Sequence, residues 1–409
     1  MKEKSKYKLK QGERVRPDGL YEFRTSRNKK TYSVYGKSVN EMRAKKDTLL
    51  RQLDNGIKVE KQKCSLNELA EEYLAYKRKN VEKTTFSTMK YMYDKYVRND
   101  IGQLKISDIR RTTIKDYYSK LLNDNKLSIT TVSRIDGIIK PMLERAVDDD
   151  ILLKNPASRV CGEIKRENHL TTPKVNVPDP DEVKRFLEFL INNPSYSPTI
   201  KNIFICIAGT GGRVSEITAC TWNNVDFENN VLHIREEIGY YVDENNHRCR
   251  MIKKPKSESG IRDIPMIKAV REAFEREKRY QEELGIEQFG LDGISDFCFL
   301  SNRGKPFVRE TINYHLKKII KDYNESVGSE KYSIKSFSTH ALRHAFCTAL
   351  CLSTDDIKAI QSIMGHKDVT VSLEWYASAT QKGMQLSMES FEKNLGISEI
   401  YYPEWEFNC

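Results

Sequence analysis

The chain has 409 residues, which is enough for two or three domains with hydrophobic cores of ordinary size. Its 69 Lys and Arg residues outnumber its 58 Asp and Glu residues, and the resulting net charge of +11 favours a negatively charged partner such as nucleic acid. The strongest apolar run, residues 203–208, is far shorter than the roughly 20 residues of a membrane-spanning helix, so we expect no membrane partner.

The positive charge is concentrated in the first part of the chain. Residues 1–60 hold 17 basic and 8 acidic residues, a net charge of +9, and residues 61–160 add about +6. The remainder is near −4. We therefore expect the basic part to make most of the contacts with nucleic acid.

The nine cysteines include no Cys-x-x-Cys pair. The lysine-rich start also lacks the apolar core of a secretory leader, so free thiols in a reducing cytoplasm are expected. Cys347 and Cys351 lie four residues apart without a second spaced Cys or His pair. We interpret them as small buried groups and predict no metal site.

Residues 1–60 form the first section. Segments 19–24 and 30–35 alternate apolar and polar residues between turn-prone stretches, which predicts a β-hairpin. Ser38 is the expected N-cap of a helix that runs to about residues 55–56. A small basic sheet with one supporting helix suits a DNA major groove, although such a sheet can also have no role in DNA binding. Its DNA-binding candidates are Arg24 and Lys30.

Residues 65–160 form an all-helical second section. It opens with a capping box, Ser65 to Glu68, followed by an amphipathic pattern that continues through several helices. Hydroxyl and cationic side chains near two helix starts suit phosphate groups, but helix capping or simple solvation explains them equally well. The phosphate-contact candidates are Thr84, Thr85, Lys90, Thr130, Thr131 and Arg134.

A polar, proline-containing linker is expected at residues 161–177, before a third section at 178–395. The third section opens with a helix-start signal at 179–182 and contains strand-like segments at 231–235 and 238–242. Helices with a small sheet on one side indicate an α+β arrangement. The whole chain is thus predicted to be a multidomain α+β protein, with a small sheet and helix first, an all-α domain second and a mixed, mainly α domain third.

Six residues of the third section have the chemistry of phosphoryl transfer to a tyrosine. The planar guanidinium groups of Arg213 and Arg343 match the non-bridging oxygens of a phosphodiester, whose charge grows in the transition state. A phenol is mostly protonated at neutral pH, so a nucleophilic tyrosine needs a neighbouring proton acceptor. The six candidates are Arg213, Lys256, His340, Arg343, His366 and Tyr376.

The spacing of these residues supports one shared site. Residues 340–351 lack Pro and Gly and predict a helix with His340 and Arg343 on one face. A second predicted helix ends at Gly365, so His366 emerges from the turn beyond it. His340 and His366 are the candidates for moving the phenol proton.

The remaining polar groups of these motifs have different expected roles. Lys256 is the candidate acid for the departing 5′ oxygen, although neighbouring lysines leave that assignment open. His344 is expected to pack or form a hydrogen bond structurally. Glu216, three residues after Arg213, is expected to orient a basic group.

This ordered set of motifs resembles the tyrosine recombinases, the phage integrase family. The resemblance covers roughly residues 65–395 and extends more weakly to an amino-terminal module similar to that of integrases from conjugative transposons and lambda-type phages. It implies an arm-type DNA-binding domain at 1–60, a core-binding, SAM-like domain at 65–160 and a catalytic domain at 178–395. In such a catalytic domain, Tyr376 forms a 3′-phosphotyrosyl bond that conserves the energy of the phosphodiester, so no cofactor is expected.

The resemblance implies a cytoplasmic, DNA-associated integrase of a mobile element or prophage. Its expected partners are double-stranded DNA at core and arm sites, three further copies of the chain in a tetramer on two duplexes, and an accessory excisionase. A type IB topoisomerase and an accessory DNA-binding protein with an inactive site are the alternatives. The aromatic, acidic tail at 396–409 is expected either to pack on a neighbouring protomer or to be disordered.

Overall fold

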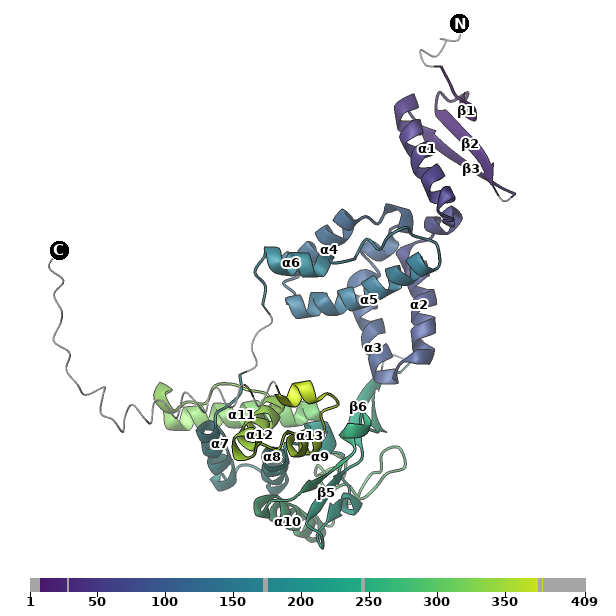
Figure 1. Ribbon diagram of the computed structural model, residues 1–409. Coiled ribbons are helices and arrows are strands. Elements are labelled where there is room, and N and C mark those ends of the chain that lie inside the picture. Colours follow the sequence, from purple (N-terminus) through teal and green to yellow (C-terminus); the bar gives the residue numbers. More distant parts are fainter. Residues whose placement is uncertain (1–7, 28, 172–175, 244–246, 374–376, 378–409) are drawn as a thin grey trace, which may run out of the picture. The chain divides into compact units, whose positions relative to one another are not determined.

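The computed structural model describes residues 8–27, 29–171, 176–243, 247–373 and 377. The chain divides into two units, Met1–Pro173 and Lys174–Cys409 (Figure 1). Among the described residues, no helix is both long enough and apolar enough to cross a membrane. Eight cysteines are described, and all eight are free thiols.

The amino-terminal part of the first unit is a three-stranded antiparallel sheet beside one helix. Strand β2 (Tyr21–Arg27) pairs with β3 (Lys30–Gly36) as the predicted hairpin, and Ser38 caps helix α1 (Val39–Asp54) as expected. Strand β1 (Glu13–Val15) on the other side of β2 was not predicted. The buried position of this strand is occupied by Glu13, which forms ion pairs, and not by an apolar residue. The sequence therefore shows no apolar alternation that would predict the strand.

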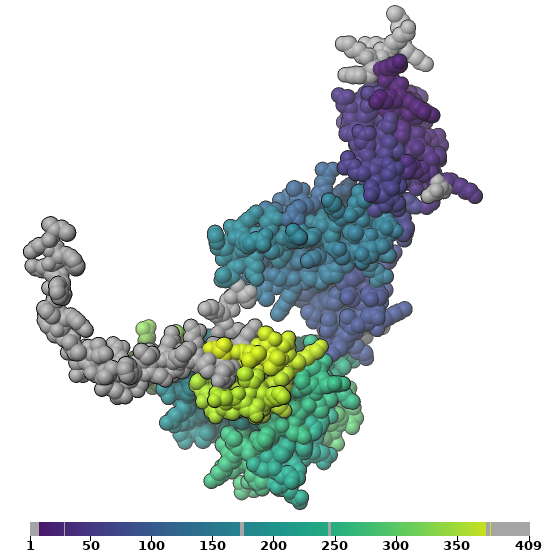
Figure 2. Space-filling view, in the orientation of Figure 1, coloured from purple at the N-terminus to yellow at the C-terminus, as the bar shows by residue number. Residues whose placement is uncertain are grey.

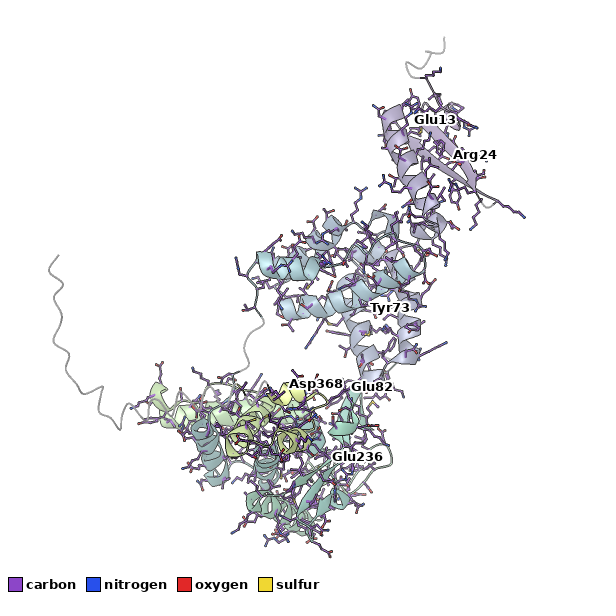
Figure 3. All side chains as sticks on the ribbon, viewed as in Figure 1. Glu13, Arg24, Tyr73, Glu82, Glu236 and Asp368 are labelled. Carbon is purple, nitrogen blue, oxygen red and sulfur yellow. The ribbon has the colours of Figure 1, made fainter. Side chains whose placement is uncertain are left out.

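Glu13, labelled in Figure 3, is held in this buried position by two cations of helix α1, Arg43 and Lys46. Arg43 Nη2 lies 2.9 Å and Lys46 Nζ 3.0 Å from its carboxylate oxygens. These partners lower the pKa of Glu13 to about 2, with the Arg43 hydrogen bond as the largest cause. The strand therefore depends on contacts that lie some 30 residues away in the sequence.

The rest of the first unit is helical, as predicted. The Ser65 side chain and the Glu68 carboxylate form the expected capping box at the start of α2. Buried residues from most of its helices, among them Leu66, Tyr118 and Ile139, form one core. Its elements are η1 (Val59–Lys63), α2 (Leu66–Asn80), α3 (Lys83–Met92), the π-helical turn η2 (Tyr93–Val97), η3 (Ile101–Gln103), η4 (Ile106–Asp108), α4 (Arg111–Asn123), α5 (Ile129–Asp148) and α6 (Val160–Glu167).

Helix α6 corrects the expectation that a linker begins at residue 161. Val160, Cys161 and Ile164 lie on one face of α6 and are buried in the same core as the other helices. The polar character of this segment comes from its exposed face, which includes Glu163 paired with Arg111 and Lys115. The helical part therefore extends further along the chain than its polar composition suggested.

The second unit has the predicted α+β character, and its described residues combine helices with two small antiparallel sheets. One sheet has the order β4-β5-β8 and the other is the hairpin β6-β7, whereas a single sheet had been expected. The elements are α7 (Pro180–Asn192), α8 (Pro198–Thr210), α9 (Val214–Ile217), η5 (Trp222–Asn224), β4 (Val225–Asp226), β5 (Val231–Ile234), β6 (Glu237–Val242), β7 (Arg248–Lys253), η6 (Glu258–Gly260), β8 (Arg262–Pro265), α10 (Lys268–Leu284), α11 (Arg309–Val327), η7 (Glu330–Tyr332), α12 (Thr339–Ser353) and α13 (Ile357–Met364).

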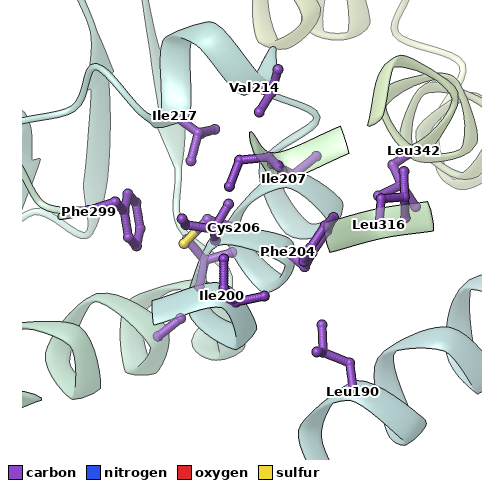
Figure 4. Close-up of a cluster of buried hydrophobic side chains, with 14 of the residues drawn as sticks. Leu190, Ile200, Phe204, Cys206, Ile207, Val214, Ile217, Phe299, Leu316 and Leu342 are labelled. Atoms are coloured by element: carbon purple, nitrogen blue, oxygen red, sulfur yellow. The ribbon is translucent and has the colours of Figure 1, made fainter. Parts of the chain in front are cut away.

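Helix α8 is the centre of this unit (Figure 4). It is apolar on nearly all sides, as its run at 203–208 suggested, and it packs against α7, α9, α10 and α12. Phe204 and Ile207 are completely buried among side chains from these neighbours. The packing fixes the carboxyl end of α8, from which the first motif of the candidate site continues. Helix α13 and the turn after it, in yellow, form part of the surface of the unit (Figure 2).

Candidate active site

Arg213 lies in the short turn between helices α8 and α9. Gly211 ends α8 in the left-handed conformation, with φ of 61°, and Arg213 occupies the N-cap position of α9. Its backbone N–H and its Nη1 donate to the two carboxylate oxygens of Glu216, at 2.8 and 2.5 Å. The Arg213 side chain remains 37% exposed, so part of its guanidinium is accessible to a ligand.

Glu216 is buried at the meeting point of three arginines. Arg262 binds both of its oxygens, from Nη1 at 3.2 Å and Nη2 at 2.9 Å, and Arg343 Nη1 lies 4.0 Å from Oε2. Burial alone would raise the pKa of Glu216, but the charge and hydrogen bonds of Arg262, with Arg213 and Arg343, lower it to about 2. The carboxylate is therefore ionised at neutral pH and orients basic groups, as expected for this residue.

Arg343 extends from helix α12 into the interior, where its side chain is 2% exposed. Its Nη1 donates to the carbonyl of Gly211 at 2.8 Å, and its Nη2 donates to the carbonyl of Met364. Burial, followed by the charge of Arg213, lowers its pKa to about 9, so it stays protonated at neutral pH. A phosphate at this position would have to bind those N–H groups of the Arg343 guanidinium that do not donate to the two carbonyls.

Two histidines share helix α12 with Arg343. The ring centroids of His340 and His344 lie 4.4 Å apart in an edge-to-face arrangement. His340 is exposed, but protein atoms partly desolvate its ring and lower its pKa, as do the charges of Arg343 and Arg213. Desolvation, followed by His340 and Arg343, lowers the pKa of the half-buried His344 to about 4. Both rings are thus favoured in the neutral form.

His366 follows the expected C-terminal stop of helix α13. Gly365 takes the left-handed conformation, with φ of 64°, and His366 then points its Nδ1 to within 2.9 Å of Oγ of the buried Ser372. Desolvation and the charges of Arg343, Arg213 and Arg262 lower the pKa of His366 to about 4. A neutral imidazole under the influence of three arginine charges has the protonation state that a proton acceptor needs.

Lys256 lies in the exposed loop between β7 and β8. The nearby Lys253 is mostly buried, and its Nζ lies 2.9 Å from Glu237 Oε1. This ion pair makes Lys253 a poorer candidate for the acid than Lys256. Tyr376, the expected nucleophile, lies outside the described residues.

The structure brings Arg213 and Arg343 together around Glu216 and places His340 and His366 close enough for the arginine charges to influence their pKa values. Arg262 is the residue that the sequence analysis missed. It occupies an inward position of strand β8, two residues before the buried Ile264. The available signal was the charged Arg262 at a position of the alternating segment 262–265 where an apolar, inward-facing residue is expected.

The DNA-binding candidates lie on the surface of the first unit, where several already have protein partners. Lys30 pairs with Glu60, Lys90 with Asp94 at 2.5 Å, and Thr84 Oγ1 lies 3.4 Å from Glu82. Thr131 lies in the first turn of α5, where its backbone N–H donates to Oγ of the N-cap residue Ser128 at 3.3 Å. The other candidates are exposed or half-exposed: Arg24 on β2, Thr85 on α3, and Thr130 and Arg134 on the first turns of α5.

Known proteins share both the sequence and the fold. A transposase from transposon Tn916 of Enterococcus faecalis is 28% identical over 405 residues, which cover 94% of this chain and 95% of the relative. The Tn1549 transposon integrase, solved in complex with transposon right-end DNA, is 27% identical and matches with a TM-score of 0.68 over 80% of this chain and 99% of that one. A lambda integrase tetramer bound to a Holliday junction matches in fold, with 15% identity and a TM-score of 0.51 over 91% of this chain and 96% of that one.

Two family descriptions match separate parts of the chain. Residues 65–122 match the SAM-like N-terminal domain of phage integrases. Residues 176–382, which contain all six expected catalytic positions, match the phage integrase family itself. This chain therefore belongs to the phage integrase family, the tyrosine recombinases.

Proposed function

We propose that this chain is the integrase of a mobile element or prophage, which cuts and rejoins DNA at specific sites through a tyrosine nucleophile. One observation carries the proposal: Arg213 and Arg343, from motifs far apart in the sequence, converge on the buried carboxylate of Glu216. With Arg262 also present, three guanidinium charges face one carboxylate charge. The excess positive charge suits a phosphodiester.

In the proposed reaction, separate side chains accept the phenol proton, stabilise the charge on the phosphate and protonate the leaving oxygen. Tyr376 Oη attacks the scissile phosphorus and transfers its proton to His366, whose ring is neutral because its pKa is lowered to about 4. Arg213 and Arg343 bind the non-bridging oxygens as charge develops there, and His340 assists their orientation. The bond to the 5′ oxygen breaks, and Lys256 protonates that oxygen as it leaves.

The product of this step is a 3′-phosphotyrosyl bond and a free 5′ hydroxyl. Attack of a 5′ hydroxyl from a second duplex reverses the proton transfers and restores the phosphodiester. The number of phosphodiester bonds is unchanged, so the exchange needs no external energy source.

The proposed division of labour follows the domains. The basic module at 1–60 binds arm sites, the helical domain at 65–160, continued by α6, binds the core site, and residues 178–395 carry the chemistry. The Tn1549 integrase, which resembles most of this chain, was solved with DNA. Lambda integrase, which shares the fold, forms a tetramer on a Holliday junction. We infer that this chain also binds double-stranded DNA and acts as a tetramer on two duplexes, with an excisionase assisting excision.

The test is covalent capture of DNA. The wild-type chain is incubated with nicked oligonucleotides from the ends of the host element, without metal or nucleotide, and then denatured. A protein–DNA band at one sequence supports the proposal. Bands at every sequence would indicate a topoisomerase, and DNA binding without any covalent band would indicate an accessory protein. Tyr376→Phe should bind the same DNA but form no covalent band. Tyr314→Phe, at an exposed position on α11, is the matched control and should form the band as the wild type does.

A further inference from the structure

Arg262 makes four hydrogen bonds in the interior of the second unit. Its side chain is 3% exposed, and its fork binds both oxygens of Glu216. Its Nη1 also donates to the carbonyl of Gly260 at 3.0 Å, and its Nε donates to the carbonyl of Ile363 at 2.7 Å. One guanidinium therefore contacts its own loop at Gly260, two residues earlier, and two segments that are distant in the sequence, at Glu216 and at Ile363.

Each of these segments carries a different candidate catalytic residue. Glu216, in helix α9, accepts two hydrogen bonds from Arg213 and so orients it. Gly260 ends the loop that contains Lys256, and Ile363 lies in the last turn of α13, three residues before His366. The Arg262 side chain is thus the physical link between the first arginine, the lysine loop and the second histidine.

The packing around this link leaves little room for adjustment. A Cβ atom added to Gly365 would lie 2.7 Å from the carbonyl oxygen of Ser259 and 3.0 Å from Cδ of Arg262. Such distances are below van der Waals contact, so the turn before His366 rests directly on the lysine loop and on Arg262. A shift in any one of the three segments would therefore be transmitted to the other two.

The charge of Arg262 has a second consequence. Glu216 carries one negative charge, and the two-point contact with Arg262 offsets it. With Arg262 present, the three arginines carry two more positive charges than Glu216 offsets, even though Arg213 Nη1 also donates to Glu216. With a neutral residue at position 262, Arg213 and Arg343 alone would offset the carboxylate, and less positive charge would remain for a phosphate.

We propose that Arg262 is a positioning residue for DNA cleavage. It holds Arg213, the Lys256 loop and His366 in fixed positions relative to one another, and it offsets the negative charge of Glu216. The proposal rests on the recombinase function proposed above. It requires the planar fork, because a lysine has one nitrogen and cannot reach Glu216 and the Ile363 carbonyl together in the same geometry. Arg262 itself does not touch DNA.

The test compares Arg262→Lys and Arg262→Gln with a matched control, Arg271→Lys. Arg271 binds Glu275 at 2.9 Å and the carbonyl of Phe227 at 2.6 Å, so it also joins a carboxylate to a backbone oxygen, but away from the candidate site. Three quantities are measured for each variant: the rate of covalent capture at saturating nicked DNA, the Kd for the same DNA, and the NMR signals of the His366 ring in the free protein.

We expect capture by Arg262→Lys to be about 10- to 100-fold slower, because small displacements of reacting groups have effects of this size. The Kd should change less than about threefold, since the surface that meets DNA is retained. The His366 signals should move in both Arg262 variants, and Arg271→Lys should match the wild type throughout. Capture within threefold of the wild-type rate, or unmoved His366 signals, would overturn the proposal.

The NMR measurement separates this proposal from the recombinase function. A wild-type chain that captures no DNA would refute the function, whereas the His366 signals would still show whether Arg262 positions that residue. If neither Arg262 variant folds, Gly365→Ala disturbs the same contact from the opposite side. Displaced NMR signals of the Arg262 guanidinium in that variant support the link, and unmoved Arg262 signals would overturn it.

Discussion

The guanidinium of Arg343 donates a 2.8 Å hydrogen bond from Nη1 to the carbonyl oxygen of Gly211, which lies 132 residues earlier in the chain. The acceptor is the residue that ends helix α8, two positions before Arg213. The second arginine of the candidate site is therefore fixed by the backbone that presents the first. The geometry of the pair depends on the turn at Gly211 as much as on the arginines.

Substitution of Gly211 should accordingly cost more than substitution of another glycine at a helix end. Its φ is 61°, and an added Cβ would lie 2.3 Å from Cδ1 of Phe346. We expect Gly211→Ala to lower the free energy of unfolding by about 2–5 kcal/mol, from left-handed strain and overpacking together. Chemical denaturation followed by circular dichroism measures the change.

Gly285 provides the control for that experiment. It ends helix α10 with φ of 56°, and nothing lies within 4 Å of its added Cβ. Gly285→Ala should therefore show only the backbone strain, about 1–2 kcal/mol. Equal losses in the two variants would mean that the contact with Phe346 relaxes without cost.

Glu216→Gln should destabilise the chain strongly. The substitution removes the carboxylate charge while Arg262 and Arg343 stay buried, and breaking a buried ion pair typically costs about 3–5 kcal/mol. Glu275→Gln removes a comparable carboxylate from an exposed pair with Arg271, so its effect should stay within about 1 kcal/mol. If Glu216→Gln and Glu275→Gln change the denaturation midpoint by similar amounts, the stability of the three-arginine cluster does not depend on the charge of Glu216.

His366 should remain neutral well below the pH at which a free histidine becomes charged. Its pKa is lowered from 6.5 to about 4, chiefly by desolvation and then by the arginine charges. NMR titration of selectively labelled histidine should therefore show no protonation of the His366 ring at pH 5.5. A midpoint near 6.5 would contradict the proposed proton acceptor.

The same shift predicts how stability depends on pH. Between pH 6.5 and about 4 the unfolded chain binds a proton at His366 that the folded chain does not. The free energy of unfolding should therefore fall as the pH is lowered through this range, with up to about 1.4 kcal/mol per pH unit from this one group. His366→Gln should show a shallower dependence, and an unchanged slope would assign the pH dependence to other groups.

Arg134 offers a test of DNA contact by the helical domain. It is exposed near the start of α5. The logarithm of the binding constant falls as the logarithm of the salt concentration rises, and the loss of one phosphate contact decreases the magnitude of this slope by about 0.9. We expect that decrease for Arg134→Ala with core-site DNA, and for Arg24→Ala with arm-site DNA. Lys115→Ala is the control, because Lys115 Nζ lies 2.9 Å from both Glu163 and Glu167. If Arg134→Ala leaves the slope as Lys115→Ala does, Arg134 contacts no phosphate.

The features that were predicted correctly depend on short-range signals. The hairpin of β2 and β3 follows from alternation, and the capping box at Ser65 and the helix start at Asp179 follow from residues within three positions of each other. Helix α12 begins and ends within two residues of its expected bounds. These elements are encoded where neighbouring residues already decide the backbone conformation.

The features that were missed depend on distant partners. Strand β1 needs Arg43 and Lys46 to bury Glu13. Strand β7 forms by pairing with β6, where Lys253 lies opposite Glu237. The role of Arg262 depends on Glu216 and Ile363, which no local pattern connects. The motifs named the residues of the candidate site, but the charges and contacts that organise them required the folded chain.

The most direct test of the central claim is to identify the residue that becomes bonded to DNA. Wild-type protein is trapped on nicked core-site DNA, digested with nuclease and protease, and analysed by mass spectrometry for a peptide that carries a nucleotide. The proposed mechanism predicts a nucleotide on Tyr376 alone, and its loss in Tyr376→Phe with DNA binding retained. A nucleotide on any other residue, or an adduct that persists in Tyr376→Phe, would contradict it.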